Sequence, residues 1–245
     1  MKDVHIRVGT WNVQYATPDR NSARLQRLIA EYCDVIVLTE THSDLALPDP
    51  YKPVAMGQRP GARLGGSWVT IWTRREVTGR FESAPDLRAI AVELEDSVVV
   101  YGTVLPWDSE SLPDTPADAR AKSWAEFLRL LPQHERRWEE LRAAHPDHLL
   151  VVAGDLNQSL GHGDGYGSKD ARAALRRSLT AAGLTCFTDG DRFEADLAED
   201  PIDHICAAPP SGATLHASNW KAWEGRSLDG AKLSDHSGVA VTIST

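Results

Sequence analysis

The chain has 245 residues, of which 42% are hydrophobic and 25% are charged, and this composition excludes a fibrous or intrinsically disordered protein. Large α/β sandwiches reach this length as one unit, so we expect a single domain over residues 1–245. The formal net charge is −9. That balance argues against a strongly basic groove for long nucleic acid, because Lys and Arg side chains supply most of the non-specific affinity for phosphates.

The N-terminal residues and the cysteines indicate a compartment. The chain enters an apolar strand within its first residues and shows no long apolar segment, so we expect neither a secretory signal nor a membrane span, although a removed signal peptide would leave the same sequence. Cys33, Cys186 and Cys206 are odd in number and lack metal-type spacing. This pattern is typical of reduced cysteines in a cytoplasmic protein. We also expect the protein to be a monomer with no membrane partner.

Strand-like and helix-like segments alternate along the first half of the chain. Apolar runs predict strands, and apolar residues at helical spacing predict helices. In the first part of the chain we expect a strand over 4–11, a helix over 19–32, a strand over 34–39, an irregular connection over 47–60 and a half-buried strand over 65–72. A hairpin of 88–94 and 98–104 follows, and then a helical segment over 118–144 that is interrupted at Pro132. The last part is expected to hold a buried strand over 149–153, a helix over 169–182 and strands over 202–207 and 239–243. The strands of a hairpin pair antiparallel, whereas strands joined through a helix can pair parallel. The sequence therefore predicts a mixed sheet.

The segment from Leu149 to Gln158 is the most informative part of the sequence. Residues 149–153 form an unbroken apolar run, the pattern of a strand buried on both faces, and the run ends abruptly in Gly154-Asp155-Leu156-Asn157. If the extended geometry continues past Gly154, Asp155 and Asn157 point to the same side. An ordinary strand-terminating turn uses the same residue types, so this segment alone does not establish a site.

Other strand-like runs also end in polar residues. The first ends at Asn12 and the second at Glu40, Asp203 and His204 lie inside an apolar frame, and Asp235-His236 precedes the last strand. Carboxylate and amide oxygens suit a hard cation such as Mg²⁺, and a histidine remains for hydrogen bonding or proton transfer. The sequence therefore predicts a cation-binding cluster at the ends of several strands.

The ordered motifs resemble the endonuclease/exonuclease/phosphatase superfamily, which includes pancreatic-type deoxyribonucleases, abasic-site endonucleases, inositol-polyphosphate 5-phosphatases and sphingomyelinases. The resemblance extends from residue 10 to residue 236. The motifs are Thr10-Trp11-Asn12, the strand that ends at Glu40, Gly154-Asp155-Leu156-Asn157, Ile202-Asp203-His204-Ile205 and Ser234-Asp235-His236. Each motif is short, but their order and spacing together are specific.

The resemblance implies a fold, an activity and a set of site residues. The implied fold is a four-layer α/β sandwich of two packed mixed β-sheets flanked by helices. The implied activity is Mg²⁺- or Mn²⁺-dependent hydrolysis of a phosphate ester, nucleic acid included. By resemblance, Glu40 holds the metal with Asn12 beside it, Asp235 is an additional metal ligand, Asp155 activates the attacking water, Asn157 donates its amide to the phosphate, and Asp203 orients His236, which contacts the phosphoryl oxygen.

One position departs from the family pattern. The family usually carries a histidine or tyrosine after the strand that follows the hairpin, whereas here Thr103 or Val104 occupies that place. Neither side chain is an acid at neutral pH. Tyr101 or a water on the metal would then have to assist the leaving group.

Several other unusual segments are expected to be structural. We expect the glycines of 161–167 to form a loop at the rim of the site, since their spacing does not match a dinucleotide-binding motif. Acids are dense over 189–200, which predicts a solvated connection. The remaining expectations are a surface position for the helical segment His134–Trp138, a packed structural role for His204, and packing of Trp220 and Trp223 against the edge of the sandwich.

Two classes of function remain open at this stage. A hydrolase would act as a nuclease if a basic strip flanks the cluster and as a small-molecule phosphodiesterase or phosphatase if the walls are neutral. The alternative is a catalytically weak member of the fold that only binds a ligand or partner. The missing histidine or tyrosine favours that alternative, whereas the other motif positions oppose it, because clustered carboxylates are costly to keep without a use.

Overall fold

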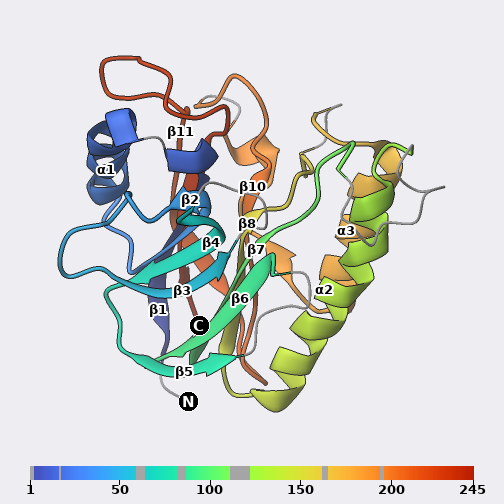
Figure 1. Ribbon diagram of the computed structural model, residues 1–245. Helices are drawn as coiled ribbons and strands as arrows, with labels where there is room; N and C mark the ends of the chain where they lie inside the picture. The colour runs from blue at the N-terminus through green and yellow to red at the C-terminus, as the bar shows by residue number, and fades with distance from the viewer. Residues whose placement is uncertain are drawn as a thin grey trace.

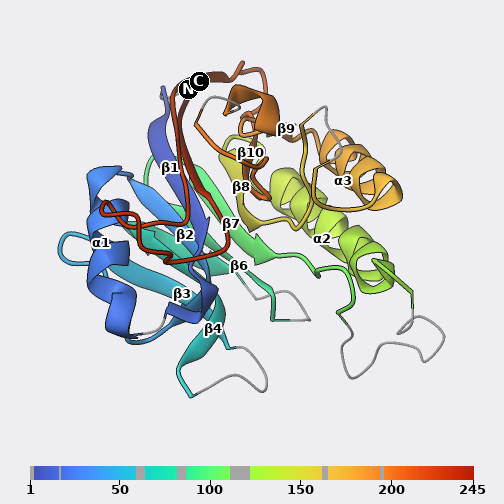
Figure 2. The same cartoon turned by 90° about the horizontal axis from the view of Figure 1, so that it is seen from above.

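Two six-stranded β-sheets pack face to face, with helices on both outer faces (Figure 1). The structure is a computed structural model that describes residues 3–16, 18–58, 64–81, 87–110, 122–161, 165–193 and 196–245. Seen from above, α1 covers one sheet and α2 and α3 cover the other (Figure 2). The predicted four-layer α/β sandwich is confirmed.

Both sheets are mixed. The first has the order β11 (His216–Trp223), β12 (Gly238–Ser244), β1 (His5–Asn12), β2 (Val35–His42), β4 (Gly66–Thr73) and β3 (Lys52–Gln58). The second has the order β5 (Val77–Phe81), β6 (Ala89–Leu94), β7 (Val98–Val104), β8 (Leu149–Asp155), β10 (Asp203–Ala208) and β9 (Thr185–Cys186). The pairs β1–β2 and β7–β8 are parallel and every other described pair is antiparallel.

Three α-helices complete the layers: α1 (Asn21–Ala30), α2 (Ala125–Ala144) and α3 (Lys169–Ala181). Short 3₁₀ turns lie at Gln14–Ala16, Pro18–Arg20 and Gly190–Arg192. The Ser168 hydroxyl caps α3 by accepting a hydrogen bond from the Ala171 amide at 3.1 Å. None of the helices described is long and apolar enough to cross a membrane.

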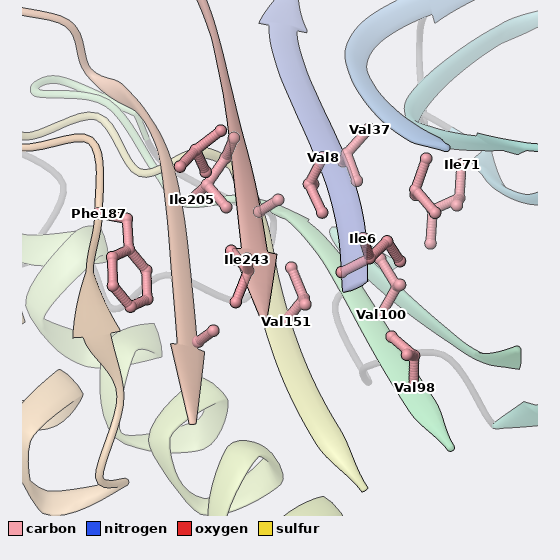
Figure 3. Packing of buried hydrophobic residues seen from close by; sticks show 14 of the residues in the cluster. Ile6, Val8, Val37, Ile71, Val98, Val100, Val151, Phe187, Ile205 and Ile243 are labelled. Atoms are coloured by element: carbon pink, nitrogen blue, oxygen red, sulfur yellow. The ribbon is translucent and has the colours of Figure 1, made fainter. Parts of the chain in front are cut away.

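The central hydrophobic core lies between the two sheets (Figure 3). Ile6, Val8 and Val37 from the first sheet face Val100 and Val151 from the second. Complete burial of each such side chain contributes about 1.5–3 kcal/mol of hydrophobic free energy. Because side chains alternate between the faces of a strand, the inward positions that follow these apolar residues are Asn12, Thr39 and Asp155, at one end of the core.

Two further cores hold the helices against the sheets. Leu28 of α1 packs on Ile36 and Trp72 outside the first sheet. Phe127 and Trp138 of α2 pack outside the second sheet. Together with the central core, these cores bury both faces of β2, β4, β7 and β8. The polar residues at the ends of these strands are therefore held in fixed positions.

The β6–β7 hairpin forms because the residues that connect its strands adopt a tight turn. Asp96 and Ser97 have φ angles of 62° and 60°, the left-handed pair of a tight turn whose twist matches that of the strands. Gly102 in β7 lies where the sheets approach closely, since an added Cβ would be 2.8 Å from a methyl group of Val69. The predicted hairpin over 88–94 and 98–104 is confirmed.

Several local predictions were wrong. The segment expected to be irregular contains β3, an edge strand in which Pro53 is tolerated because its missing N–H need not join the sheet. Strand β4 is buried on both faces instead of half-buried, and α2 runs through Pro132 without interruption. Strands β5 and β11 were not predicted.

The surface position predicted for the helical segment His134–Trp138 holds only for its middle residues. Arg136 is exposed, whereas His134 and Trp138 are both buried on the side of the second sheet. The Nδ1 atom of His134 is 2.8 Å from the hydroxyl of Tyr101. The helix therefore presents its polar histidine to a tyrosine of the sheet, which a helical spacing count alone does not reveal.

Candidate active site

The polar strand ends meet at one end of the sandwich. Because β1 and β2 are parallel, their C-terminal residues share one edge, and β10 starts opposite the end of β8, with Asp203 paired to Asp155. A cleft of about 300 Å³ opens there. It is lined by Glu40, Trp107, Asp155, Asn157, Tyr166, Glu199, Asp200, Pro201, Ile202, Asp235, His236 and Ser237.

Five of the seven predicted site residues line this cleft, and Asn12 and Asp203 are bonded to two of them from behind. Asn12 donates an amide hydrogen to Asp155 Oδ2 at 2.9 Å, and Asp203 Oδ2 is 2.7 Å from His236 Nδ1. The sequence separations are 143 and 33 residues respectively. The fold thus brings all seven residues together.

The chain turns sharply at Asp155 instead of continuing extended. Asp155 Oδ1 accepts the Asn157 backbone N–H at 2.9 Å, and Asn157 has a φ of 52°. Of the two alternatives left open by the sequence, the turn is the one observed after Asp155, and the Asp side chain closes a turn of the kind that Asp and Asn favour. Both side chains still reach the cleft, where the Asn157 amide donates to Leu105 O at 2.8 Å.

Gly154 makes this turn possible. Its φ is +140°, and an added Cβ would overlap the Thr103 carbonyl oxygen of the neighbouring strand. We expect Gly154→Ala to destabilise the fold by more than about 1 kcal/mol, because the clash is with rigid backbone. The measurement is urea unfolding, with Gly212→Ala as the matched control, since Gly212 also has a positive φ but nothing within 4 Å of an added Cβ. Equal losses in the two variants would show that the close strand contact does not matter.

Asp155 is the most perturbed carboxylate of the site. It is 2% exposed. Burial, together with the negative charge of Asp203, raises the pKa of Asp155 to about 7, against the opposing effects of the His236 charge and the Asn12 hydrogen bond. A carboxylate with this pKa is half-protonated near neutrality and can accept a proton.

His236 is held by its ring and by its backbone. Burial alone would lower the pKa of His236, but the charges of Asp155 and Asp203 outweigh it and raise this pKa to about 10. The imidazole is therefore protonated at neutral pH, with Nδ1–H donating to Asp203. Its Nε2 faces the cleft, 3.9 Å from Asp155 Oδ2 and 4.0 Å from Asp235 Oδ1.

Trp11 and Ser234 fix the His236 backbone, a role that the sequence analysis did not assign. Trp11 Nε1–H donates to His236 O at 3.0 Å. The Ser234 hydroxyl accepts the His236 N–H at 3.1 Å and donates to Asn12 O at 2.6 Å. Trp11 and Ser234 belong to the sequence motifs that contain Asn12 and His236. Their place in these motifs was the feature of the sequence that could have indicated their role.

The residues present fit a divalent cation. Glu40 has a φ of 50°, a left-handed conformation that is uncommon for a residue with a side chain, and it lines the cleft with Asp235, whose side chain is 50% exposed. Asp203 Oδ1 is buried and has no hydrogen-bond partner in the described part of the chain. Asp155 and Asp203 bring carboxylate oxygens within 4.8 Å of each other beside the ring of His236. Clustered carboxylate oxygens of this kind are the donor set that Mg²⁺ and Mn²⁺ prefer.

The cleft walls are acidic. Glu199 and Asp200, which lie in the segment predicted to be a solvated connection, line the cleft, where Glu199 is exposed and Asp200 is half-buried. Phe193 and Leu197 of the same segment are buried in the central core and hold it in place. Among the described residues that line the cleft, none is Lys or Arg.

Tyr101 cannot assist the leaving group as proposed from the sequence. It is 1% exposed, packs outside the second sheet under α2, and its hydroxyl contacts His134, so it lies on the face opposite the cleft. Neither Thr103 nor Val104 lines the cleft. Trp107 and Tyr166, which the sequence analysis did not select, do line it.

Three residues left outside the site are structural, as predicted. Both ring nitrogens of the buried His204 contact backbone carbonyls, those of Thr188 and Gln158, at 3.0 and 2.9 Å. Trp223 is buried edge-on to Trp11, and Trp220 Nε1–H donates to Phe187 O at 3.0 Å. The tryptophans therefore pack at the sandwich edge.

A divalent cation should stabilise this protein. We expect saturating Mg²⁺ or Mn²⁺ to raise the melting temperature, because it relieves repulsion among the carboxylates, with a gain of about 2.7 kcal/mol at a hundredfold excess over the dissociation constant. Thermal unfolding of wild type and Glu40→Gln measures this, and the variant should show a smaller shift. A melting temperature that millimolar Mg²⁺, Mn²⁺ and Ca²⁺ all leave unchanged would count against a metal site.

Comparison with known proteins identifies the family. No curated protein matches this sequence. Among solved structures, an AP endonuclease from Archaeoglobus fulgidus is 17% identical with a TM-score of 0.68, covering 96% of this chain and 98% of its own. The 3' phosphatase NExo from Neisseria bound to product DNA hairpin is 22% identical with a TM-score of 0.66 over 96% and 98% of the two chains. TDP2 from D. rerio complexed with single-strand DNA product is 16% identical with a TM-score of 0.66 over 98% and 99%. At these identities the likeness establishes the fold.

A family model matches nearly the whole chain. The model of the Endonuclease/Exonuclease/phosphatase family matches residues 9–236, a span that starts one residue before Thr10 of the first motif and ends at His236 of the last. The chain therefore belongs to the endonuclease/exonuclease/phosphatase family, whose members are metal-dependent phosphoesterases.

Proposed function

We propose that this protein hydrolyses phosphate esters by water attack on phosphorus, with Mg²⁺ or Mn²⁺ bound in the acidic cleft. The observation that carries the proposal is the convergence of Asp155 with the Asp203–His236 pair, where Asp155 Oδ2 lies 3.9 Å from His236 Nε2. A carboxylate that can accept a proton and an imidazole that can donate a hydrogen bond therefore face the same space. Both groups accelerate hydrolysis of a phosphate ester.

Asp155 is assigned the role of general base. Its buried carboxylate is fixed by the hydrogen bonds from the Asn12 amide and the Asn157 backbone. A fixed base removes a proton from a water in the cleft without reorganising during the reaction. The Asn157 side chain donates to Leu105 O with one amide hydrogen, and the second is assigned to the phosphate.

His236 is assigned the role of phosphate contact. Because Nδ1–H is used by Asp203, the Nε2–H that faces the cleft is the free donor. A protonated imidazole stabilises the negative charge that accumulates on the phosphoryl oxygens. Asp203 positions the ring and keeps it protonated.

The metal is assigned to the carboxylates at the mouth of the cleft. A protonated His236 cannot be a ligand, so Glu40 and Asp235 would hold the ion. When bound, the cation would neutralise charge on the phosphate, because the described residues that line the cleft include no Lys or Arg to do so.

Tyr166 is the substitute that we propose for the absent family histidine or tyrosine. Burial and the charge of Asp155 raise the pKa of Tyr166 above its ordinary value, so its hydroxyl remains protonated at neutral pH. Like Trp107, it lines the cleft. A phenol in this position can donate a hydrogen bond to the departing oxygen.

The shape and charge of the cleft favour a compact substrate. A volume of about 300 Å³ and acidic walls suit a small phosphate ester or a chain end more than a long duplex held by backbone contacts. The relatives NExo and TDP2 were each seen with a DNA product. Terminal phosphates on DNA are therefore proposed beside small esters.

A substrate panel tests this proposal. We would measure Mg²⁺-dependent turnover of bis-p-nitrophenyl phosphate, p-nitrophenyl phosphate, and single-stranded DNA and RNA with and without terminal phosphates. Turnover of esters and chain ends, with slow cleavage of internal duplex bonds, is expected. Rapid internal cleavage of duplex DNA would contradict the compact-substrate assignment, and tight binding with no turnover of any ester would favour the catalytically weak binding member of the fold.

A further inference from the structure

A second cluster of metal-ligating side chains lies at the opposite end of β8 from the cleft. It consists of Glu93 in β6, His145 at the C-terminal end of α2, and His148 directly before β8, with ligand atoms within 4.8 Å of one another. Asp155 ends the same strand, 7 residues long, so the two clusters are separated by roughly 20 Å. The cluster takes no part in the proposed hydrolysis.

The side chains are already arranged around a common point. His148 Nε2 is 2.9 Å from Glu93 Oε1, and the rings of His145 and His148 are 5.1 Å apart between centroids and nearly perpendicular at 76°. His148 Nδ1 is buried and has no hydrogen-bond partner among the described residues. An unsatisfied buried nitrogen costs free energy, so a partner for this ring would stabilise the folded state.

The backbone around the cluster is well fixed. His145 N–H donates to Leu141 O at 2.9 Å and His148 N–H donates to His145 O at 3.1 Å, which closes a turn that places both rings on one side. Leu149 N–H joins the turn to Ser97 O of the β6–β7 hairpin at 2.9 Å. The backbone that carries the two histidines is thus fixed beside the strand that carries Glu93.

An ion can reach the cluster from solvent. A cavity of about 370 Å³ adjoins it, lined by Glu139, Arg142, Ala143, His145, Pro146, His148, Pro209 and Ser211. The side chains of His148 and Glu93 are 20% and 28% exposed. Arg142 donates to Ala182 O at 2.7 Å, which directs its positive charge towards α3.

We propose that Glu93, His145 and His148 form a binding site for Zn²⁺. Two imidazole nitrogens and one carboxylate oxygen suit Zn²⁺, whereas Mg²⁺ prefers oxygen ligands alone. Three protein ligands leave one tetrahedral position for water. The bound ion would link the end of α2 and the start of β8 with β6. It would thereby hold the helix layer against the sheet, far from the catalytic cleft.

The experiment is equilibrium dialysis of the full chain, without a polyhistidine tag, against Zn²⁺ in the presence of millimolar Mg²⁺. Mg²⁺ occupies the oxygen-rich cleft and leaves the imidazole site free. We expect one tightly bound Zn²⁺ per chain, with affinity about tenfold or more weaker in His145→Ala, His148→Gln and Glu93→Gln. His216→Ala is the matched control, since His216 is an exposed histidine on the edge strand β11.

A second readout separates this site from the hydrolase site. Zn²⁺ should raise the melting temperature of wild type and of Glu40→Gln equally, and should have little effect on His148→Gln. The three variants of the cluster should keep wild-type Mg²⁺-dependent turnover. Zn²⁺ binding that is unchanged in His148→Gln and Glu93→Gln, or that is lost in Glu40→Gln, would overturn the assignment whether or not the chain is a hydrolase.

Discussion

Replacing Asp155 by Ala is expected to lower kcat/KM for phosphate esters by about a hundredfold or more, since the water would lose its base. His236→Ala should cause a loss of similar size, because the transition state would lose a charged hydrogen-bond donor. The measurement is steady-state turnover of a diester in saturating Mg²⁺, with circular dichroism and melting temperature to establish folding. Removing Asp155 also relieves repulsion with Asp203, so we expect the fold to persist.

The matched control for these variants is Asp3→Ala. Asp3 is an exposed carboxylate in the described part of the N-terminus and does not line the cleft. Like Asp155→Ala, it removes one aspartate side chain, so it separates a general effect of losing a carboxylate from the loss of the base. Near-wild-type turnover by a folded Asp155→Ala variant would refute the assignment of Asp155.

Asp203→Asn tests the pair that supports His236. The amide keeps the shape of the carboxylate but removes the negative charge that raises the pKa of His236. The pKa should therefore fall, the imidazolium should lose its proton at lower pH than in wild type, and activity should decline most on the alkaline side. The measurement is the pH profile of kcat/KM for wild type and Asp203→Asn.

A double-mutant cycle completes this test. Once His236 is replaced by Ala, Asp203 has no ring to orient or charge, so Asp203→Asn should cause little further loss. The expected interaction reflects the 2.7 Å contact between Asp203 Oδ2 and His236 Nδ1. If the losses of the two single variants simply multiply in the double variant, the residues act independently and Asp203 has another function.

The site was predictable because its residues belong to short motifs at strand ends. Asp155 follows a run that is apolar in every position, and such a run is buried on both faces in this structure, as expected. Strand alternation then directs Asn12 and Asp155 into the same interior. The pairing of Asp203 with His236 across 33 residues was implied by the family resemblance and has the expected geometry here.

What the sequence did not reveal depends on contacts between distant segments. Tyr101 was proposed for the leaving group, yet the alternation of β7 turns it towards α2 and away from the cleft. Glu199 and Asp200 resembled solvated acids because the buried Phe193 and Leu197 that anchor their segment are isolated apolar residues in the sequence. Tyr166 carries no local signal, since only the assembled fold brings it into the lining of the cleft.

Edge strands were the least predictable elements. In β3, Pro53 argues against a strand because proline interrupts the hydrogen bonding of a sheet. In β11, polar and apolar residues alternate only weakly, and a bulge follows between Ser218 and Lys221. Both strands pair on one side only, so their sequences are free of the constraints that make a central strand recognisable. Central strands such as β8 were therefore predicted more accurately than edges.

The most direct test of the central claim is the dependence of ester turnover on Mg²⁺ concentration in wild type and in Glu40→Gln. Glu40 lines the cleft with Asp155 and His236, and we assign it to the metal. We expect no turnover without Mg²⁺. In Glu40→Gln we expect half-saturation to shift to an Mg²⁺ concentration about tenfold or more higher, with turnover partly restored at saturation. Turnover that is independent of Mg²⁺ and Mn²⁺, or an identical Mg²⁺ dependence in both proteins, would contradict that claim.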